Sequence, residues 1–135
     1  MSISKKAIIA FISGCLGGVA VNTFNLLFGF LNLPRLVGFD FMPDFNLIDL
    51  LSDLGWGGLW GLLFLVPFLD GMITLKGILI GALSFCVQML VAISYIHHHP
   101  VGLMDPLPLI AYLFGLNAFW GIVSSLSWNS WKDFA

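Results

Sequence analysis

The chain has 135 residues, of which 59% are hydrophobic and 9% are charged, and its net charge is −2. Five basic and seven acidic side chains cannot cover a 14.8 kDa globule in water, and the mean hydropathy of +1.02 is far above that of a soluble domain. Nucleic-acid binding is excluded because no run of basic residues is present to neutralise phosphates. The long apolar stretches instead predict transmembrane helices of about 20 residues.

The first apolar segment covers about residues 7–30 and follows two lysines. Its start also resembles a bacterial lipoprotein signal, because ISGC, which ends at Cys15, matches the small-residue box before a lipidated cysteine. Two features oppose that interpretation: the apolar run before Cys15 is short, and the chain after it stays apolar instead of becoming a polar tether. We therefore expect a first membrane helix here.

The second span follows a polar interruption, NLPRLVGFDFMPDF, at residues 32–45. The sixteen residues between Asp53 and Asp70 are too few to cross about 30 Å at 1.5 Å per residue. We therefore expect the helix to start near residue 45, with Asp44 as its cap, and to run to about residue 68. Asp49 then lies near the membrane interface, and Asp53 lies about one turn deeper.

Two further spans are predicted at about residues 76–96 and 107–128. The third follows Lys76 and ends before His97-His98-His99-Pro100, since a helix tends to stop before proline. The connection between the second and third spans is brief, so these neighbours should be antiparallel. The predicted fold is an all-α integral membrane protein: a single four-helix transmembrane bundle that covers residues 1–135.

The few cations predict how the bundle is oriented. Four lysines (Lys5, Lys6, Lys76 and Lys132) fall on one side, and only Arg35 falls on the other. Because cytoplasmic loops carry an excess of Lys and Arg, both termini are expected in the cytoplasm. The expected location is the bacterial inner membrane or an equivalent internal membrane.

The second and fourth spans resemble each other. LGWGGLWGLLF (54–64) aligns with FGLNAFWGIVS (114–124) at an offset of sixty, which matches Gly55 with Gly115, Trp60 with Trp120 and Gly61 with Gly121. Both segments run in the same direction, although the first and third spans align poorly. We interpret the chain as two hairpins of the same orientation, a parallel repeat.

Small residues four apart occur in every span. Residues at i and i+4 share a helix face, and without side chains they let backbones approach closely where lipid removes the hydrophobic drive. The predicted helix-packing residues are Gly14 and Gly18, Gly57 and Gly61, Gly77 and Gly81, and Ala111 and Gly115.

Polar residues within the spans are few, and by depth they gather in the middle and outer half of the bilayer. An amide or a carboxylate in hydrocarbon needs a partner. The favoured interpretation is an interhelical hydrogen-bond cluster, and the alternative is a water-lined vestibule that ends at Asp53 and opens to the outside. The candidate binding residues are Asn22, Asn25, Asp53, Gln88 and Asn117, with Thr23 and Ser84 nearby.

The three consecutive histidines raise a metal or pigment hypothesis. His97, His98 and His99 lie on the same side as Asp105, and imidazole with carboxylate is a plausible ligand set for zinc, copper or iron. Consecutive residues point about 100° apart on a helix, however, so at most two can reach one ion. An interfacial cap is the preferred interpretation of this run.

Three segments, LGWGGLWGLLF, LKGILIGAL (75–83) and YLFGLNAFWGI (112–122), resemble the YagU-like group of small bacterial inner-membrane proteins. In that group, glycine-rich first and third spans, a tryptophan-glycine second span and a proline-glycine loop before the last span recur in this order. The last span of the group often carries a histidine where this chain has Asn117. The resemblance implies a membrane fold and carries over no functional residue.

No enzyme is expected, because the chain has no glutamate, no nucleophile elbow and no phosphate-binding loop. No cofactor is required by the sequence. We expect an accessory or scaffolding subunit of a larger membrane complex that acts through helix–helix packing, with membrane lipid, other membrane-protein subunits or further copies of the chain as partners. The alternative is an oligomeric channel or carrier with a polar site in the outer half of the bilayer.

Overall fold

A computed structural model describes residues 2–38, 46–95 and 107–133, and the regular secondary structure in these ranges is all helical, with no strand in them. Its elements are α1 (Ile3–Phe30), the short α2 (Leu33–Leu36), α3 (Leu47–Gly61), the 3₁₀ helix η1 (Leu62–Leu65), α4 (Ile73–Tyr95) and α5 (Leu107–Trp131).

Four helical segments in the described ranges are long and apolar enough to cross a membrane: α1, α3 together with η1, α4 and α5. The prediction of an all-helical fold with four helices long and apolar enough to cross a membrane is confirmed for the described ranges. The second span differs at its ends, since it begins at Leu47 and stops at Leu65 instead of residue 68. Its cap is Asn46, whose side chain accepts a 2.9 Å hydrogen bond from the Ile48 backbone N–H, in place of the predicted Asp44.

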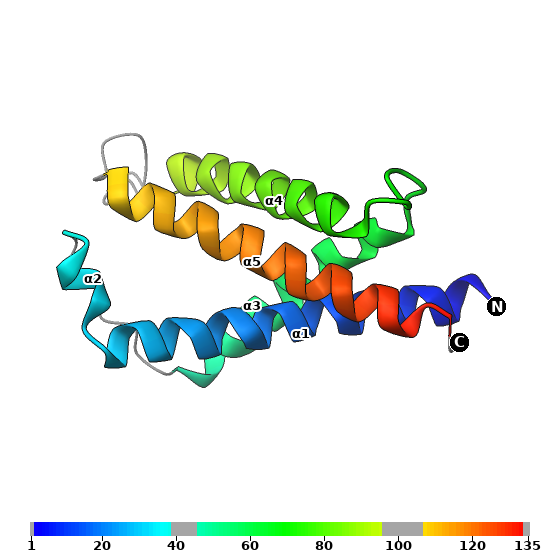
Figure 1. Cartoon of the computed structure of the whole chain (residues 1–135), viewed down its shortest axis with the longest axis horizontal. Coiled ribbons are helices and arrows are strands. Elements are labelled where there is room, and N and C mark those ends of the chain that lie inside the picture. The colour runs from blue at the N-terminus through cyan, green and yellow to red at the C-terminus, as the bar shows by residue number, and fades with distance from the viewer. Residues whose placement is uncertain (1, 39–45, 96–106, 134–135) are drawn as a thin grey trace.

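The four long helices run up and down in turn, so that the start of α1, the connection from η1 to α4 and the end of α5 lie at one end of the bundle (Figure 1). We call this the terminal end and the other the distal end. The closest packing joins α1 with α3, α4 with α5, and α1 with α5. The helices therefore form an open array in the order α3, α1, α5, α4, with α3 and α4 at its two edges.

Large apolar side chains cover the outside of the array, among them Ile8, Leu27, Leu59 and Leu90, which are all more than half exposed. The buried positions are instead rich in glycine and serine, with a small number of large side chains such as Phe64 and Trp120. An apolar surface around an interior of small residues is typical of helices that pack in lipid, where close backbone contact replaces the hydrophobic effect as the driving force.

Glycines bring the backbones of α1 and α3 together near the terminal end. A Cβ atom added at Gly14 would overlap the carbonyl oxygen of Gly57, and one added at Gly61 would overlap the carbonyl oxygen of Ala10. Gly18 is also close, with the Asp53 carbonyl oxygen 3.3 Å from such an atom. No larger residue fits at these positions without moving backbone.

The α4–α5 pair is built in the same way. A Cβ atom at Gly77 would overlap the carbonyl oxygen of Gly121, and one at Gly81 would overlap the carbonyl oxygen of Asn117. The predicted pair Ala111 and Gly115 behaves differently, because both residues are exposed and nothing lies within 4 Å of a Cβ atom at Gly115. The close contact on α5 therefore lies at Gly121, about 1.7 turns beyond Gly115 along the helix.

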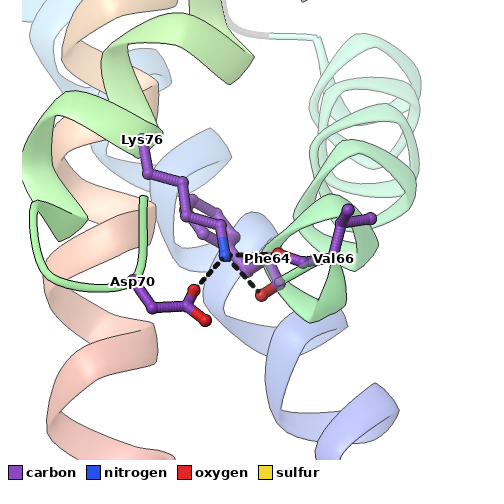
Figure 2. A network of polar contacts seen from close by, with 4 residues as sticks. All are labelled: Phe64, Val66, Asp70 and Lys76. Atoms are coloured by element: carbon purple, nitrogen blue, oxygen red, sulfur yellow. Dashed lines mark hydrogen bonds and ion pairs between the residues drawn. The ribbon is translucent and has the colours of Figure 1, made fainter. Parts of the chain in front are cut away.

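A buried lysine closes the terminal end between α3 and α4 (Figure 2). The Lys76 side chain is 0% exposed, and its ammonium donates hydrogen bonds to the carbonyl oxygens of Phe64 (3.0 Å) and Val66 (2.7 Å) and to Asp70 Oδ1 (2.7 Å). The Phe64 carbonyl lies in the last turn of η1, where carbonyl oxygens lack a partner within the helix. The Val66 carbonyl, on the residue after η1, also accepts from the Phe68 backbone N–H at 2.9 Å. Lys76 thus fastens the start of α4 to the end of the preceding span.

Asp70, at the other side of this ion pair, is 63% exposed. The hydrogen bond from Lys76 lowers the pKa of the Asp70 carboxyl below its usual value. The connection also holds Leu69 in the left-handed region, at φ 52°, which is costly for a residue with a branched side chain. The Lys76 bonds on both sides of Leu69 hold the turn in this form.

Candidate functional site

A partly open cavity of about 170 Å³ lies among the four long helices. Every one of these helices contributes at least one polar side chain to its wall. Six polar residues line it: Asn22 and Asn25 from α1, Asp53 from α3, Ser84 and Gln88 from α4, and Asn117 from α5. The structure therefore brings the five candidate binding residues together at one place, with Ser84 beside them. Thr23 is exposed, and its hydroxyl donates to the Val19 carbonyl oxygen within α1.

Two polar pairs hold neighbouring helices together at the cavity wall. Asn22 Nδ2 donates to Asp53 Oδ2 and to the Gly18 carbonyl oxygen, each at 3.0 Å. Asn117 Nδ2 donates to Gln88 Oε1 at 3.2 Å and to the Leu113 carbonyl oxygen at 3.0 Å. The first pair links α1 with α3, and the second links α4 with α5.

A third pair joins the two hairpins, because the Tyr112 hydroxyl donates to Asn25 Oδ1. Within the described part of the chain, the amide N–H groups of Asn25 and Gln88 and one oxygen of Asp53 carry no hydrogen bond. A hydrogen-bond cluster and a cavity therefore coexist here, and the remaining donors and acceptor are available to a guest molecule or to water.

Indole rings form the apolar part of the wall. Trp56 and Trp60 line the cavity from α3, and their rings meet edge to face with centroids 5.8 Å apart. Asp53, Trp56 and Trp60 lie at i, i+3 and i+7, so they share one face of the helix. Trp120 completes the wall from α5, where its Nε1 donates a 2.9 Å hydrogen bond to the Gly14 carbonyl oxygen.

Asp53 is the one ionisable group among the residues that line the cavity. Its partner is the neutral amide of Asn22, and no ion pair to it exists in the ranges that the structure describes. A carboxylate among apolar helices is costly unless a positive charge, a proton or water accompanies it. The cavity wall thus carries an acidic side chain that has no cationic partner in the described ranges.

The cavity lies toward the distal end of the bundle. Asn22 precedes the last residue of α1 by eight residues, or about 12 Å of helix. The two hairpins diverge toward this end, whereas the glycine contacts and Lys76 close the terminal end (Figure 1). Access from the distal side is therefore the shorter path to Asp53.

The predicted metal or pigment ligands, His97, His98, His99 and Asp105, lie outside the described residues. Within the described ranges, no group of three His, Cys, Asp or Glu side chains is close enough to hold a metal ion.

Three polar roles were missed by sequence reasoning. Tyr112 and Trp120 bind residues on α1 that are 87 and 106 positions away, and Lys76 is buried although it appeared to be a surface charge. One signal was present for Lys76, since a lysine between two apolar helices and six residues after an aspartate can form a local ion pair.

Comparison of the chain with protein-family models, with curated proteins and with solved structures gives no match. The resemblance to the YagU-like group therefore stays a prediction.

Proposed function

We propose that the protein is a multi-pass membrane carrier or channel that binds one small solute in the cavity. The observation that carries this proposal is the convergence of polar side chains from all four long helices on one cavity within an otherwise apolar bundle. Polar residues inside a membrane are costly, and they commonly mark the path of a substrate or ion. Unused hydrogen-bonding groups on the wall give such a solute its contacts.

The glycine contacts favour this function over the scaffolding role that the sequence predicted. That role rested in part on small-residue surfaces that could receive a helix of another subunit. Gly14, Gly57, Gly61, Gly77 and Gly81 are instead occupied by contacts within the chain. Most of the close-packing surface is therefore used to build the bundle itself.

Equivalent contacts in the two hairpins support a parallel internal repeat. Two close approaches in the first hairpin have counterparts in the second: Ala10–Gly61 with Gly77–Gly121, and Gly14–Gly57 with Asn117–Gly81. The second helices of the two hairpins, α3 and α5, correspond at an offset of 60 residues, as Gly61 does to Gly121. The first helices, α1 and α4, correspond at an offset of 67, as Gly14 does to Gly81. The first and third spans align poorly when Lys6 is matched with Lys76, because that match imposes an offset of 70.

The lining residues indicate where the cavity lies relative to the two proposed repeats. Four lining residues of α3 correspond to four lining residues of α5: Asp53 with Leu113, Trp56 with Leu116, Gly57 with Asn117, and Trp60 with Trp120. The cavity therefore lies between the two repeats. Many carriers hold their substrates at such a boundary and change access by rocking one repeat against the other.

The charges support a cytoplasmic terminal end, in the bacterial inner membrane or an equivalent internal membrane. Lys5, Lys6 and Lys132 flank the helices there, and Arg35 lies beyond the opposite end of α1. Lys76 adds less to this bias than the sequence suggested, because it is buried and paired with Asp70. In this orientation the cavity faces the outer half of the bilayer.

An accessory role remains the second candidate, and one observation favours it. Ala111 and Gly115 form an exposed small-residue face on α5 that no other described part of the chain covers. A helix of another subunit or of a second copy fits such a face. Neither candidate function includes catalysis.

A flux measurement tests the carrier. Purified protein is reconstituted in liposomes, and uptake of radiolabelled urea, glycerol, glycine and choline is compared with protein-free liposomes. We expect at least one solute to enter faster with the wild-type protein. The double variant Gln88→Leu/Asn117→Leu should lower this flux at least about tenfold, since it removes both partners of one polar pair and leaves neither unpaired.

The matched control is Asn129→Leu, which replaces an exposed amide on α5 outside the cavity and should leave flux unchanged. Flux of all four solutes at the protein-free rate, from folded wild-type protein, contradicts the carrier. Purification in mild detergent then separates the candidates, because a stoichiometric partner subunit favours the accessory role.

A further inference from the structure

We infer that the solute is a small organic ammonium cation, held by Asp53 and by the indole rings of Trp56 and Trp60. This inference rests on the proposed function and names the chemical class of its substrate. Three properties of the cavity wall carry it: its charge, its aromatic face and the difference between its two repeats.

The charge of the wall selects a cation. Asp53 lines the cavity, one of its carboxylate oxygens accepts from Asn22, and the other carries no hydrogen bond in the described ranges. The cations of the described chain lie at or beyond the ends of the long helices, and Lys76 is bound to Asp70. A positively charged guest would therefore meet a carboxylate that has no cation of its own.

The aromatic face selects an organic cation over a metal ion. A hard metal cation such as sodium or calcium needs several oxygen ligands, and the amide oxygens of Asn25 and Gln88 on this wall already accept hydrogen bonds. Two indole rings stand on the same helix face as Asp53. The face of an indole ring attracts alkylammonium groups through its quadrupole, and tryptophan is the best of the aromatic residues for this purpose. A carboxylate beside tryptophans is the usual chemistry of ammonium recognition.

Equivalent residues of the two repeats differ at the cavity wall, and this difference indicates which chemical groups the guest carries. Asp53 and Trp56 on α3 correspond to Leu113 and Leu116 on α5. The α3 side of the cavity thus carries the one charge, and the facing side carries leucines together with the neutral polar residues Ser84, Gln88 and Asn117. The guest therefore has a single positive group and an uncharged remainder, which can be apolar or carry a hydroxyl.

The cavity volume limits the size of the guest. At about 170 Å³ the cavity is close to the roughly 150 Å³ that accommodates one benzene molecule. Choline, tetramethylammonium and benzylammonium are compounds of this size. Larger amphiphiles require the helices to move apart.

Equilibrium binding to purified protein tests the inference. The protein is kept in an uncharged maltoside detergent, because phosphatidylcholine would itself supply an ammonium group. Choline, tetramethylammonium and benzylammonium are titrated, with tryptophan fluorescence and equilibrium dialysis as readouts. The uncharged isostere of choline, 3,3-dimethyl-1-butanol, is titrated beside them. We expect saturable binding of one cation per chain and no saturable binding of the isostere.

Three variants locate the site. Asp53→Asn should weaken cation binding at least about 30-fold, because it removes the counter-charge at the cavity wall. Trp60→Leu should weaken it by roughly tenfold through loss of the ring face. Asp49→Asn is the matched control, since Asp49 lies one turn earlier on α3, is exposed and does not line the cavity. The affinity of this variant for the cation should equal that of the wild type.

Equal binding of choline and its isostere overturns the inference, as does unchanged affinity in Asp53→Asn. Competition by sodium at the same concentration as choline overturns it in favour of a metal-cation site. Absence of saturable binding of all three ammonium compounds to folded protein also overturns it. The proposed function fails separately, when no solute crosses the liposome membrane; flux of urea or glycerol without cation binding rejects the cation alone.

Discussion

The terminal end and the distal end of the bundle are formed by the same four helices, yet their interiors differ. At the terminal end, glycines bring carbonyl oxygens of one helix against the backbone of the next, and Lys76 fills the remaining space. Toward the distal end, asparagines, Gln88 and tryptophans stand at the same interface and hold the helices apart around a cavity. Residue size at the helix interface therefore decides whether the bundle is closed or hollow.

The two ends also differ in how easily they can rearrange. Close backbone packing leaves little freedom for rearrangement, so the terminal end is suited to act as a fixed base. The distal end is joined by side-chain hydrogen bonds, which can exchange for bonds to a solute or to water. Changes at the terminal end should thus affect stability, whereas changes at the cavity should affect binding.

The largest effect is expected from Gly121→Leu. The new side chain would meet the Gly77 carbonyl oxygen, which is backbone and cannot turn away, so the α4–α5 pair must separate. We expect a loss of at least about 3 kcal/mol in the free energy of unfolding, measured by titration with sodium dodecyl sulphate and circular dichroism. Gly115→Leu, on the exposed face of the same helix, is the control and should unfold like the wild type. Equal stability of both variants would falsify the tight contact at Gly121.

Lys76→Met should rank next. Methionine fills the space but removes the ammonium donor from the carbonyl oxygens of Phe64 and Val66, of which Val66 keeps the Phe68 backbone N–H as a donor. The loss should be about 2 kcal/mol. The same unfolding titration measures this, with the exposed Lys5→Met as control. A wild-type unfolding midpoint in Lys76→Met would contradict the role of this lysine as a clamp.

Trp120→Phe probes the border between the two ends, because Trp120 lines the cavity and also bonds to Gly14. Loss of the indole N–H should destabilise the protein by about 1 kcal/mol, since the Gly14 carbonyl loses this partner. Trp131→Phe, at an exposed tryptophan of the same helix, should have no effect. If the two variants unfold alike, the bond from Trp120 to Gly14 contributes nothing to joining the hairpins.

The smallest effect concerns pH. Lys76 lowers the pKa of Asp70 from its ordinary value of 3.8, so the folded state binds this proton more weakly than the unfolded state does. The resulting stability is present above the unfolded pKa and is lost as the pH falls through the folded pKa. Because Asp70 is largely exposed, the loss should be small.

Unfolding titrations at neutral pH and at about pH 3 measure this contribution. Asp70→Asn should lose less stability on acidification than the wild type, because it has no carboxylate to protonate at this position. Identical losses in the two proteins would mean that the ion pair does not stabilise the fold.

Much of the fold follows from apolar patterning, because only a helix satisfies its own backbone hydrogen bonds in lipid. Segments 7–30, 76–96 and 107–128 are predicted close to α1, α4 and α5 for this reason. The end of the second span is less well predicted, since Val66 and Pro67 look apolar in sequence but belong to a turn that Lys76 fixes.

The candidate site is predicted in part. Polar side chains are rare and costly within membrane spans, so their presence indicates a structural or functional role. The sequence alone therefore identified Asn22, Asn25, Asp53, Gln88 and Asn117 as candidates. Depth alone placed them at a similar level. It could not reveal that they line one cavity, because rotation of each helix about its axis decides which way a side chain points.

The sequence by itself predicted a membrane environment, four apolar helices and the few polar residues within them. These properties depend on local hydrophobicity and segment length. The tertiary structure decided which glycines meet which carbonyls, that Ala111 and Gly115 are left exposed, and that Lys76 is buried. These outcomes depend on the rotation and register of whole helices. Contacts over a hundred residues apart set that register, as Trp120 and Gly14 do, and no local pattern encodes them.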